Sequence, residues 1–466
     1  MSIKHRNPLK KLLKNVILAC PESGLAVLVL VHLFFIYLGG YFLSPEFTVY
    51  PYLTSIGLKP YVNIVDQHLP IIFFGPLSLP SFLTKNPQPL LAIFLSLVAL
   101  TDILFFHLLK KNGVPNSVFW TALFAASLFV FQGNTLWLET FIIPLVLLLF
   151  FLKRPFFVGM LSALIILTRP TLAPAVLLLL IFKKLKLSRY LIAGFLTPFL
   201  LTLAYLTYHQ LLPDFIYLFF SFNTTYYSAL AGKLPSLRQI ALVGLVTIPA
   251  LVSLVRGKKY LSILIILTLF LPAWPRFELT HLQPAIALTL FFWVTNKSLR
   301  HSRFPLRHSR FPLRHSRAGG NLYKWIPHQV RDDKKLLLIF LIFLSIRKIT
   351  TANYGNFYLN PETQEVSSFI KTQEENQLFV LGGSDLIYPL SNKTPAGDYY
   401  LPSLPWYYAN PDFVLRQIDA LNHNPNALVV INTPVTSFAQ PVYQHILDQY
   451  TKIHTVSSYQ IYKIKP

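Results

Sequence analysis

Acidic side chains are scarce before residue 350 of this chain, so those that occur there are the first candidates for chemistry. Outside the basic N-terminal tail and a basic segment at 299–334, they are Glu46, Asp66, Asp102, Glu139, Asp214 and Glu278. Two arginines, Arg169 and Arg276, lie among the same apolar segments. A guanidinium stays charged, and its fork matches two oxygens of a phosphate. The pattern therefore predicts a site that handles an anionic group.

The composition places such a site in a polytopic membrane protein. Of 466 residues, 53% are hydrophobic and only 13% are charged, against about 25% charged in soluble proteins. This excludes a cytoplasmic enzyme and a disordered chain. The net charge of +23 would suit nucleic acid, but most Lys and Arg lie between apolar segments, where they set membrane topology. The single Cys20 excludes an intramolecular disulfide.

Apolar runs long enough to cross a bilayer recur along the chain, because a span needs about 20 apolar residues. The predicted spans are 24–43, 88–109, 115–132, 136–152, 190–211, 239–255, 260–274, 282–296 and 336–349. Between the fourth and fifth, residues 156–182 are apolar except for Arg169, which Pro170 and Pro174 follow. Proline interrupts helices, so we expect a hairpin of two short helices, 156–168 and 171–182. The chain would then make about eleven crossings.

The distribution of Lys and Arg orients these spans, because cytoplasmic segments carry the excess of positive charge. The basic segments are the tail 1–23, the loops at 110–111, 153–154, 183–189 and 256–259, and the stretch 297–335. These basic segments fall on one side of the membrane only if residues 156–182 form a hairpin. The N-terminus is then cytoplasmic and residues 350–466 are extracytoplasmic. All the candidate carboxylates except Asp102 lie on the outer side, and the localisation predicted is the cell (inner or plasma) membrane.

A repeated segment interrupts the membrane domain 24–349. RHSRFPL occupies 300–306, recurs at 307–313 and begins again at 314. Pro305 and Pro312 and the lack of an apolar seam exclude a coiled coil. The segment resembles the translated product of an interspersed bacterial DNA repeat. We interpret 299–334 as a tolerated cytoplasmic insertion without function; contact with anionic lipid headgroups is the alternative.

Residues 350–466 have a different pattern. Short β-like runs at 378–383, 427–432 and 459–464 alternate with helical patterns near 361–373, 411–423 and 437–450. Alternating strands and helices predict an α/β domain. The fold class predicted is thus a polytopic all-α membrane domain followed by a C-terminal extracytoplasmic α/β domain.

The long outer loop 44–87 carries a resemblance to a known family. Its run SPEFTVYPYLTSIGLKPYVNIVDQHLP resembles the first extracytoplasmic loop of the C-type glycosyltransferase superfamily (GT-C), polytopic enzymes that use polyprenyl-phosphate-linked sugars. The positions that fit the family's order are Glu46, Tyr50, Gly57, Pro60, Tyr61, Asp66, His68 and Pro70. Two positions depart from it: Glu46 stands where Asp is usual, often beside a second acid, and His68 where Lys is commoner.

Three further segments are similar to parts of the same family. ALIILTRPTLAP at 163–174 is similar to its short hairpin with a basic apex, and RFELTHLQPAIAL at 276–288 to the element that opens a late span. The run at 380–406 looks like the soluble domain of bacterial members. The resemblance covers nearly the whole chain apart from the insertion, and it is to bacterial members of the mannosyl- and aminoarabinosyl-transferase-like kind.

The resemblance implies a transferase of cell-envelope glycan biosynthesis that moves a hexose or pentose from a polyprenyl-phosphate donor to an extracytoplasmic acceptor with inversion. A carboxylate must take the proton of the acceptor hydroxyl, and Glu46 or Asp66 is the candidate. Fixed cations must stabilise the departing phosphate, and the candidates are Arg169, Arg276 and His68. Further substrate-binding candidates are Tyr50, Tyr61, Glu278, His281 and Gln283. The acceptor, whether lipid, glycan or protein, stays open.

No cofactor is predicted, since the sequence has no HExxH, no Cys pair and no Gly-rich phosphate loop, and a divalent metal has no motif support. Each candidate also has a structural alternative. Glu46 would be a solvated loop residue, Arg169 would snorkel or pair, and Asp102 would pair with a neighbouring helix.

Two other function classes compete with the glycosyltransferase. A transporter or lipid flippase typically has internal repeats with matching broken helices, and this chain has one broken hairpin. A polysaccharide polymerase or ligase should rely on a long late outer loop, whereas 275–281 is short.

The topology is testable with alkaline phosphatase fusions. A fusion after Lys348 should be active, because the enzyme folds only outside the cytoplasm, and fusions after Lys111, Lys186 or Lys259 should be inactive. Activity at Lys259 without activity at Lys348 would mean that 156–182 is a single span.

Overall fold

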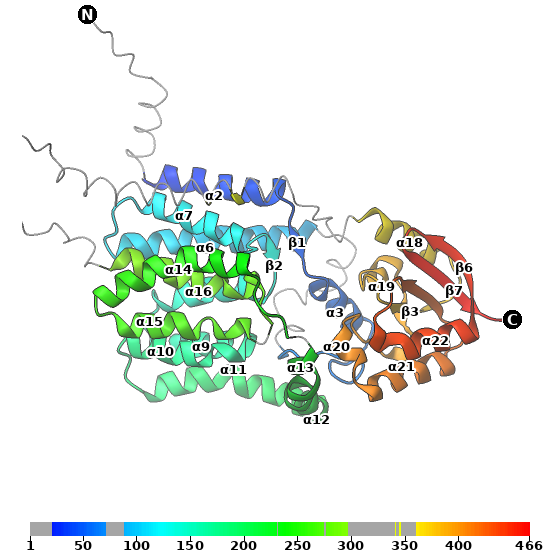
Figure 1. The fold of residues 1–466 in the computed structure, drawn as a ribbon. Helices are drawn as coiled ribbons and strands as arrows, with labels where there is room; N and C mark the ends of the chain where they lie inside the picture. Colours follow the sequence, from blue (N-terminus) through cyan, green and yellow to red (C-terminus); the bar gives the residue numbers. More distant parts are fainter. Residues whose placement is uncertain are drawn as a thin grey trace, which may run out of the picture.

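The computed structural model describes residues 21–70, 88–296 apart from 231 and 275, 341, 344–345 and 360–466. A helical part is followed by a smaller α/β domain at one end (Figure 1). The N-terminal tail as far as Cys20, the insertion 299–334 and nearly all of the predicted span 336–349 lie outside the described residues, as does 71–87 of the long outer loop.

Each predicted span from 24–43 to 282–296 contains a helix. The apolar helices are α2 (Pro21–Leu38), α6 (Gln88–Lys111), α7 (Ser117–Val130), α8 (Leu138–Leu149), α9 (Pro155–Thr168), α10 (Ala173–Phe182), α11 (Arg189–Tyr208), α14 (Leu237–Arg256), α15 (Tyr260–Thr268) and α16 (Gln283–Thr295). In the described ranges, three helices (α6, α11 and α14) are each long and apolar enough to cross a membrane alone. The others are shorter, so the count of about eleven crossings stays a prediction.

The predicted break at Arg169 is present. Helix α9 ends at Thr168, a 3-10 turn covers Pro170–Leu172, and α10 begins at Ala173. Arg169 itself has extended backbone, with φ −148° and ψ 93°, because a residue before proline disfavours the helical region. The arginine therefore lies at the turn between two short helices.

Two glycines allow α9, the first helix of the hairpin, to pack closely against α11. A Cβ added at Gly159 of α9 would lie 2.1 Å from the carbonyl oxygen of Leu191, and one at Gly194 of α11 would lie 1.9 Å from that of Phe156. Only glycine permits such an approach, as at close helix crossings in membranes. The backbone-to-backbone contact fixes α9 and hence the residue at its end.

The outer end of the helical part contains structure that the sequence did not predict. Helix α3 (Glu46–Ser55) lies inside the predicted loop 44–87, and a π-helix, η2 (Tyr217–Tyr227), follows α12 (Leu212–Ile216). Strand β1 (Phe42–Leu43) pairs in parallel with β2 (Thr135–Leu136). This short pairing brings the start of α3 beside the start of α8.

The C-terminal domain is the predicted α/β domain. Its helices are α18 (Pro361–Lys371), α19 (Ile387–Ser391), α20 (Pro405–Tyr408), α21 (Pro411–His423) and α22 (Gln440–Gln449). The strands β3 (Gln377–Leu381), β4 (Thr394–Pro395), β5 (Leu428–Asn432), β6 (Tyr450–Val456) and β7 (Tyr459–Ile464) form one sheet in the order β4-β3-β5-β7-β6. β3 is parallel to β4 and β5, and β7 is antiparallel to β5 and β6. The short β4 and the exposed β6 were not predicted.

The two parts are joined by backbone hydrogen bonds near residue 64. The amide of Val65 donates to the carbonyl oxygen of Tyr400 at 3.0 Å, and the amide of Tyr400 donates to that of Asn63 at 2.7 Å. The Asn63 side chain adds a bond to the Asp398 carbonyl oxygen at 2.8 Å. The loop that leads to Asp66 is therefore paired with the α/β domain.

Asp102, whose role the sequence left open, pairs with His32 between α2 and α6. The Nδ1 atom of His32 lies 2.7 Å from Oδ2 of Asp102, and both side chains are buried. The remaining atoms, Nε2 of His32 and Oδ1 of Asp102, have no hydrogen-bond partner within the described part of the chain. Ionisable groups inside a membrane domain usually pair in this way.

Replacing one member of this pair should destabilise the protein more than replacing both. His32→Leu leaves the Asp102 carboxyl buried without its partner, and such a loss typically costs about 3–5 kcal/mol. The double variant His32→Leu/Asp102→Leu should recover much of the loss. Thermal unfolding in detergent measures this; a His32→Leu variant as stable as the parent would contradict it.

Candidate active site

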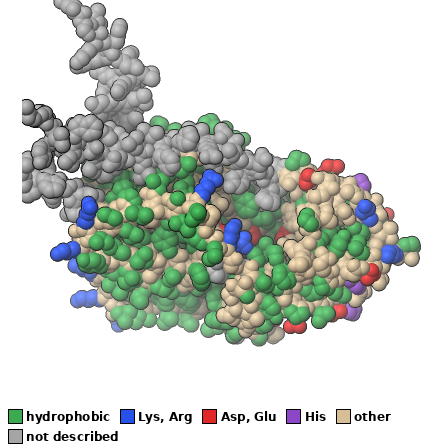
Figure 2. Space-filling view, in the orientation of Figure 1, with side chains coloured by type: hydrophobic (Ala, Val, Ile, Leu, Met, Phe, Trp, Pro, Cys, Tyr) green, Lys and Arg blue, Asp and Glu red, His purple; other side chains and the backbone are tan. Residues whose placement is uncertain are grey.

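A cavity of about 410 Å³ lies between the helical part and the α/β domain. Figure 2 shows a recess between these two parts in which acidic side chains are visible, with a basic side chain at its edge. Every residue predicted for the site lines this cavity except Tyr61 and Gln283. The structure thus brings together residues from the first outer loop, the hairpin turn and the segment before α16.

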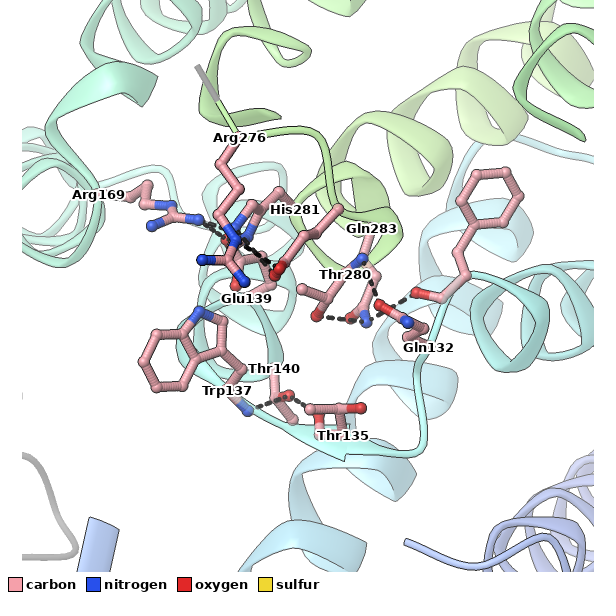
Figure 3. A network of polar contacts seen from close by, with 12 residues as sticks. Gln132, Thr135, Trp137, Glu139, Thr140, Arg169, Arg276, Thr280, His281 and Gln283 are labelled. Atoms are coloured by element: carbon pink, nitrogen blue, oxygen red, sulfur yellow. Dashed lines mark hydrogen bonds and ion pairs between the residues drawn. The ribbon is translucent and has the colours of Figure 1, made fainter. Parts of the chain in front are cut away.

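A buried carboxylate holds the hairpin arginine. Nη2 of Arg169 lies 2.7 Å from Oε1 of Glu139, the second residue of α8, and Nδ1 of His281 lies 3.0 Å from the same oxygen (Figure 3). The Glu139 side chain is 1% exposed and that of Arg169 is 15% exposed. Nε of Arg169 is buried with no hydrogen-bond partner among the residues described. Glu139 therefore fixes the guanidinium without occupying all of its donors.

The second arginine has its own carboxylate at the cavity. Nε of Arg276 donates to Oε1 of Glu278 at 2.6 Å, and Oε2 of Glu278 lies 3.7 Å from Nε2 of His281. His281 therefore lies within 4 Å of both carboxylates, with Nδ1 3.0 Å from Glu139 and Nε2 3.7 Å from Glu278. The side chains of Arg276 and Glu278 are 30% and 28% exposed. This ion pair is therefore more accessible to a ligand than the pair of Arg169 and Glu139.

Gln283 supports the segment that carries these residues. Its Nε2 donates to the carbonyl oxygen of Phe131 at 3.1 Å and to Oγ1 of Thr280 at 3.3 Å, and the Thr280 amide donates to Oε1 of Gln132 (Figure 3). Gln283 is buried and lines a separate small cavity with His32. It stabilises the turn before α16 from behind, away from the main cavity.

The first outer loop contributes two carboxylates to the cavity, and Glu46 has fewer side-chain donors than Asp66. It is the first residue of α3, and Oγ of Ser44 donates to its Oε2 at 2.5 Å. Burial raises the pKa of Glu46 above its usual range, the Ser44 hydrogen bond opposes that rise, and the charge on Asp66 adds to it. A carboxylate with a raised pKa is better able to take a proton near neutral pH.

Asp66, in contrast, is enclosed by donors. The Tyr50 hydroxyl donates to its Oδ2, and its Oδ1 accepts from the His68 amide at 2.6 Å and lies 2.8 Å from Nδ1 of His68. Burial lowers the pKa of His68, but the Asp66 carboxylate outweighs burial, so that the pKa is raised overall. The pair therefore places at the cavity an imidazole whose protonated form the Asp66 carboxylate favours.

Tyr61 lies on the far side of this loop. Its hydroxyl donates to the carbonyl oxygen of His68 at 3.0 Å, and its ring lines a second cavity of about 220 Å³ beside Asp214 and Asp412. Its backbone has φ 65°, a left-handed conformation that non-glycine residues rarely adopt. Tyr61 thus stabilises the turn that presents His68.

Sequence reasoning missed the part of the site that comes from the α/β domain. Trp406 and Tyr407 line the cavity, and Asp385 lies behind it, where Ser403 Oγ donates to its Oδ1 at 3.4 Å. Burial raises the pKa of Asp385 to about 7, and the charge on Glu46 contributes to the rise. The only signal was the likeness of 380–406 to a soluble domain, which does not say that this segment reaches the cavity.

No group of three or more His, Cys, Asp or Glu side chains that could hold a metal ion occurs in the described ranges. The chemistry available is that of a carboxylate with one side-chain donor, two guanidiniums and an imidazole, all of which line one cavity. Such an arrangement can accept a proton at one side of a substrate and stabilise negative charge at the other.

Glu139 and Glu278 offer a matched comparison of buried and open ion pairs. Glu139→Gln should lower the thermal unfolding temperature clearly more than Glu278→Gln, because it leaves the buried Arg169 without its counter-charge, whereas an exposed pair contributes little. Thermal melts in detergent compare the two. Equal losses would show that Arg169 does not depend on Glu139.

Comparison with known proteins extends the sequence resemblance to the fold. No protein-family model matches the chain, and no curated protein matches it. Among solved structures, the crystal structure of ArnT from Cupriavidus metallidurans bound to undecaprenyl phosphate is similar, with a TM-score of 0.54 at 8% sequence identity. The match covers 94% of this chain and 97% of that one. The chain therefore has the fold of ArnT over nearly its whole length, which confirms the predicted likeness to C-type glycosyltransferases at the level of the fold.

Proposed function

We propose that the protein is a membrane glycosyltransferase that transfers a sugar from a polyprenyl-phosphate donor to an acceptor on the extracytoplasmic side. The observation that carries the proposal is that Glu46 lines the same cavity as Arg169, Arg276 and His68. The ArnT fold supports it, because that protein was crystallised with undecaprenyl phosphate. The orientation proposed has a cytoplasmic N-terminus, a membrane domain at 24–349 and an outer domain at 350–466.

Glu46 is the general base in this proposal. The acceptor oxygen attacks the anomeric carbon, the bond from that carbon to the phosphate oxygen breaks, and the proton of the acceptor passes to Glu46. Ser44 is the side-chain donor to Glu46 in the described structure, whereas Asp66 accepts from Tyr50 and twice from His68. A base needs a free lone pair within reach of the proton, and Glu46 fits that requirement better than Asp66.

The cations on the opposite side stabilise the departing phosphate. Arg169 lines the cavity with a side chain that is 15% exposed, and Arg276 is the more exposed of the two guanidiniums at 30%. Charge-assisted hydrogen bonds to a developing oxyanion are the largest contribution that a fixed site makes to such a reaction. The carboxylates of Glu139 and Glu278 hold the two arginines in place.

The roles of the two loop carboxylates can be separated with purified protein and a radiolabelled polyprenyl-phosphate sugar. Glu46→Gln should cut turnover by roughly 10²–10⁴-fold, the usual contribution of a general base, and should leave donor binding nearly unchanged. The rate of the parent enzyme should fall as the pH drops through the raised pKa of Glu46, since the base acts only when deprotonated.

Asp66→Asn is the control for this assignment. In this variant the His68 ring should no longer be held by the carboxylate, so donor binding should weaken while some turnover remains. If Asp66→Asn abolishes turnover and Glu46→Gln retains it, the base is Asp66. If the parent protein moves the labelled lipid between leaflets without sugar transfer, it is a carrier and the proposed function is wrong.

A further inference from the structure

The α/β domain forms one wall of the cavity through helix α20 and the residue before it. Leu404, Trp406 and Tyr407 line the cavity. Tyr407 is held from the helical part, because its ring stacks on that of Phe222 with centroids 5.2 Å apart and its hydroxyl donates to Oε1 of Gln67. The position of this wall is therefore set by the helical part as well as by the α/β domain.

Trp406 packs against the guanidinium of Arg276. The Cζ atom of Arg276 lies 5.0 Å from the centroid of the Trp406 ring, and the ring of Tyr227 meets Trp406 edge-on at 5.5 Å. Tryptophan is the best aromatic partner for such a cation–π contact, and arginine is the cation found in it more often. The Trp406 side chain is 8% exposed, so its ring is nearly enclosed by these neighbours.

Arg276 needs such support because its segment is irregular. It follows α15 and precedes the 3-10 turn Leu279–Leu282, and its side-chain hydrogen bond in the described structure goes to Glu278, two residues away. The backbone of the segment is held by the bridge between Arg276 and Lys233 and by the Phe277 amide, which donates to the Lys233 carbonyl oxygen at 2.9 Å. These backbone contacts do not fix the direction of the guanidinium. Trp406, on an element anchored elsewhere, supplies a fixed surface for the guanidinium.

We propose that Trp406 is a positioning residue that holds the Arg276 guanidinium in the direction in which it meets the donor phosphate, so that the α/β domain forms part of the donor site. The inference rests on the proposed function in one respect, that a lipid phosphate occupies the cavity. Direct stacking of a sugar on Trp406 is the weaker explanation, because the ring is nearly enclosed and Arg276 lies over it.

The test is a double-mutant cycle read out by donor binding and by the split between KM and kcat. Trp406→Ala should weaken binding of undecaprenyl phosphate, and raise the donor KM, by roughly fivefold to thirtyfold, the range expected for loss of a partly desolvated cation–π contact. kcat should change less. Trp406→Phe should recover part of the loss because it keeps an aromatic face. In an Arg276→Ala background, Trp406→Ala should have no further effect.

Controls make each outcome decisive. Trp274→Ala removes a tryptophan that is 73% exposed and near Arg276 in sequence; it should leave binding unchanged. Thermal unfolding identifies any Trp406→Ala protein that fails to fold, and Trp406→Phe then carries the comparison. Equal losses with and without Arg276, or unchanged binding in a folded Trp406→Ala protein, would overturn the proposal.

The binding experiment also separates this inference from the proposed function. Undecaprenyl phosphate carries no sugar, so its binding needs no transfer. If the parent protein binds the lipid through Arg276 and Trp406 but transfers no sugar, the positioning role stands and the glycosyltransferase proposal fails. If transfer occurs but the cycle shows no coupling, only the role of Trp406 is wrong.

Discussion

The ion pair between Arg169 and Glu139 is the interaction on which the rest of the site depends. A guanidinium is expensive to bury in an apolar domain, and the structure offsets that cost with a carboxylate 2.7 Å away. The position of each residue of the pair depends on the local backbone. Arg169 lies at a turn because Pro170 ends α9, and Glu139 lies at the start of α8, which the β1–β2 pairing brings beside the outer loop. The close contact of α9 with α11 at Gly159 and Gly194 then prevents the turn from shifting.

The acidic side chains around the cavity divide, among the residues described, into three that pair with a cation and one, Glu46, that does not. Glu139 and Glu278 pair with arginines, and Asp66 pairs with His68. Glu46 is left with a hydroxyl as its side-chain donor. Because the paired acids keep the cations in position without neutralising every donor, an entering anion meets preorganised groups. The carboxylate that remains available is then the one free to move a proton.

Sequence patterns predicted most of the helices, the break at Arg169 and the α/β domain, because these depend on local periodicity and on proline. They also identified the charged residues of the cavity apart from Lys233, since charged groups are rare in an apolar chain, but they missed neutral polar residues such as Gln67 and Gln132. They did not predict which residues pair. His281 contacts Glu139 across 142 positions of sequence, and no local pattern encodes such a partner. Gln283 and Tyr61 were placed in the site because they fit a motif, whereas the structure has them supporting its backbone.

The contribution of the α/β domain was the hardest to foresee, because it comes from contacts between segments more than 300 residues apart. Tyr400 pairs with Asn63 and Val65 through its backbone, directly before Asp66. Any rotation of the α/β domain would therefore move Asp66 and His68 along with Trp406. The domain also places Asp385 close enough to Glu46 for the charge on Glu46 to contribute to the raised pKa of Asp385. The pKa of Asp385 thus depends on how the α/β domain lies against α3, so the carboxyl groups of the two parts are linked electrostatically.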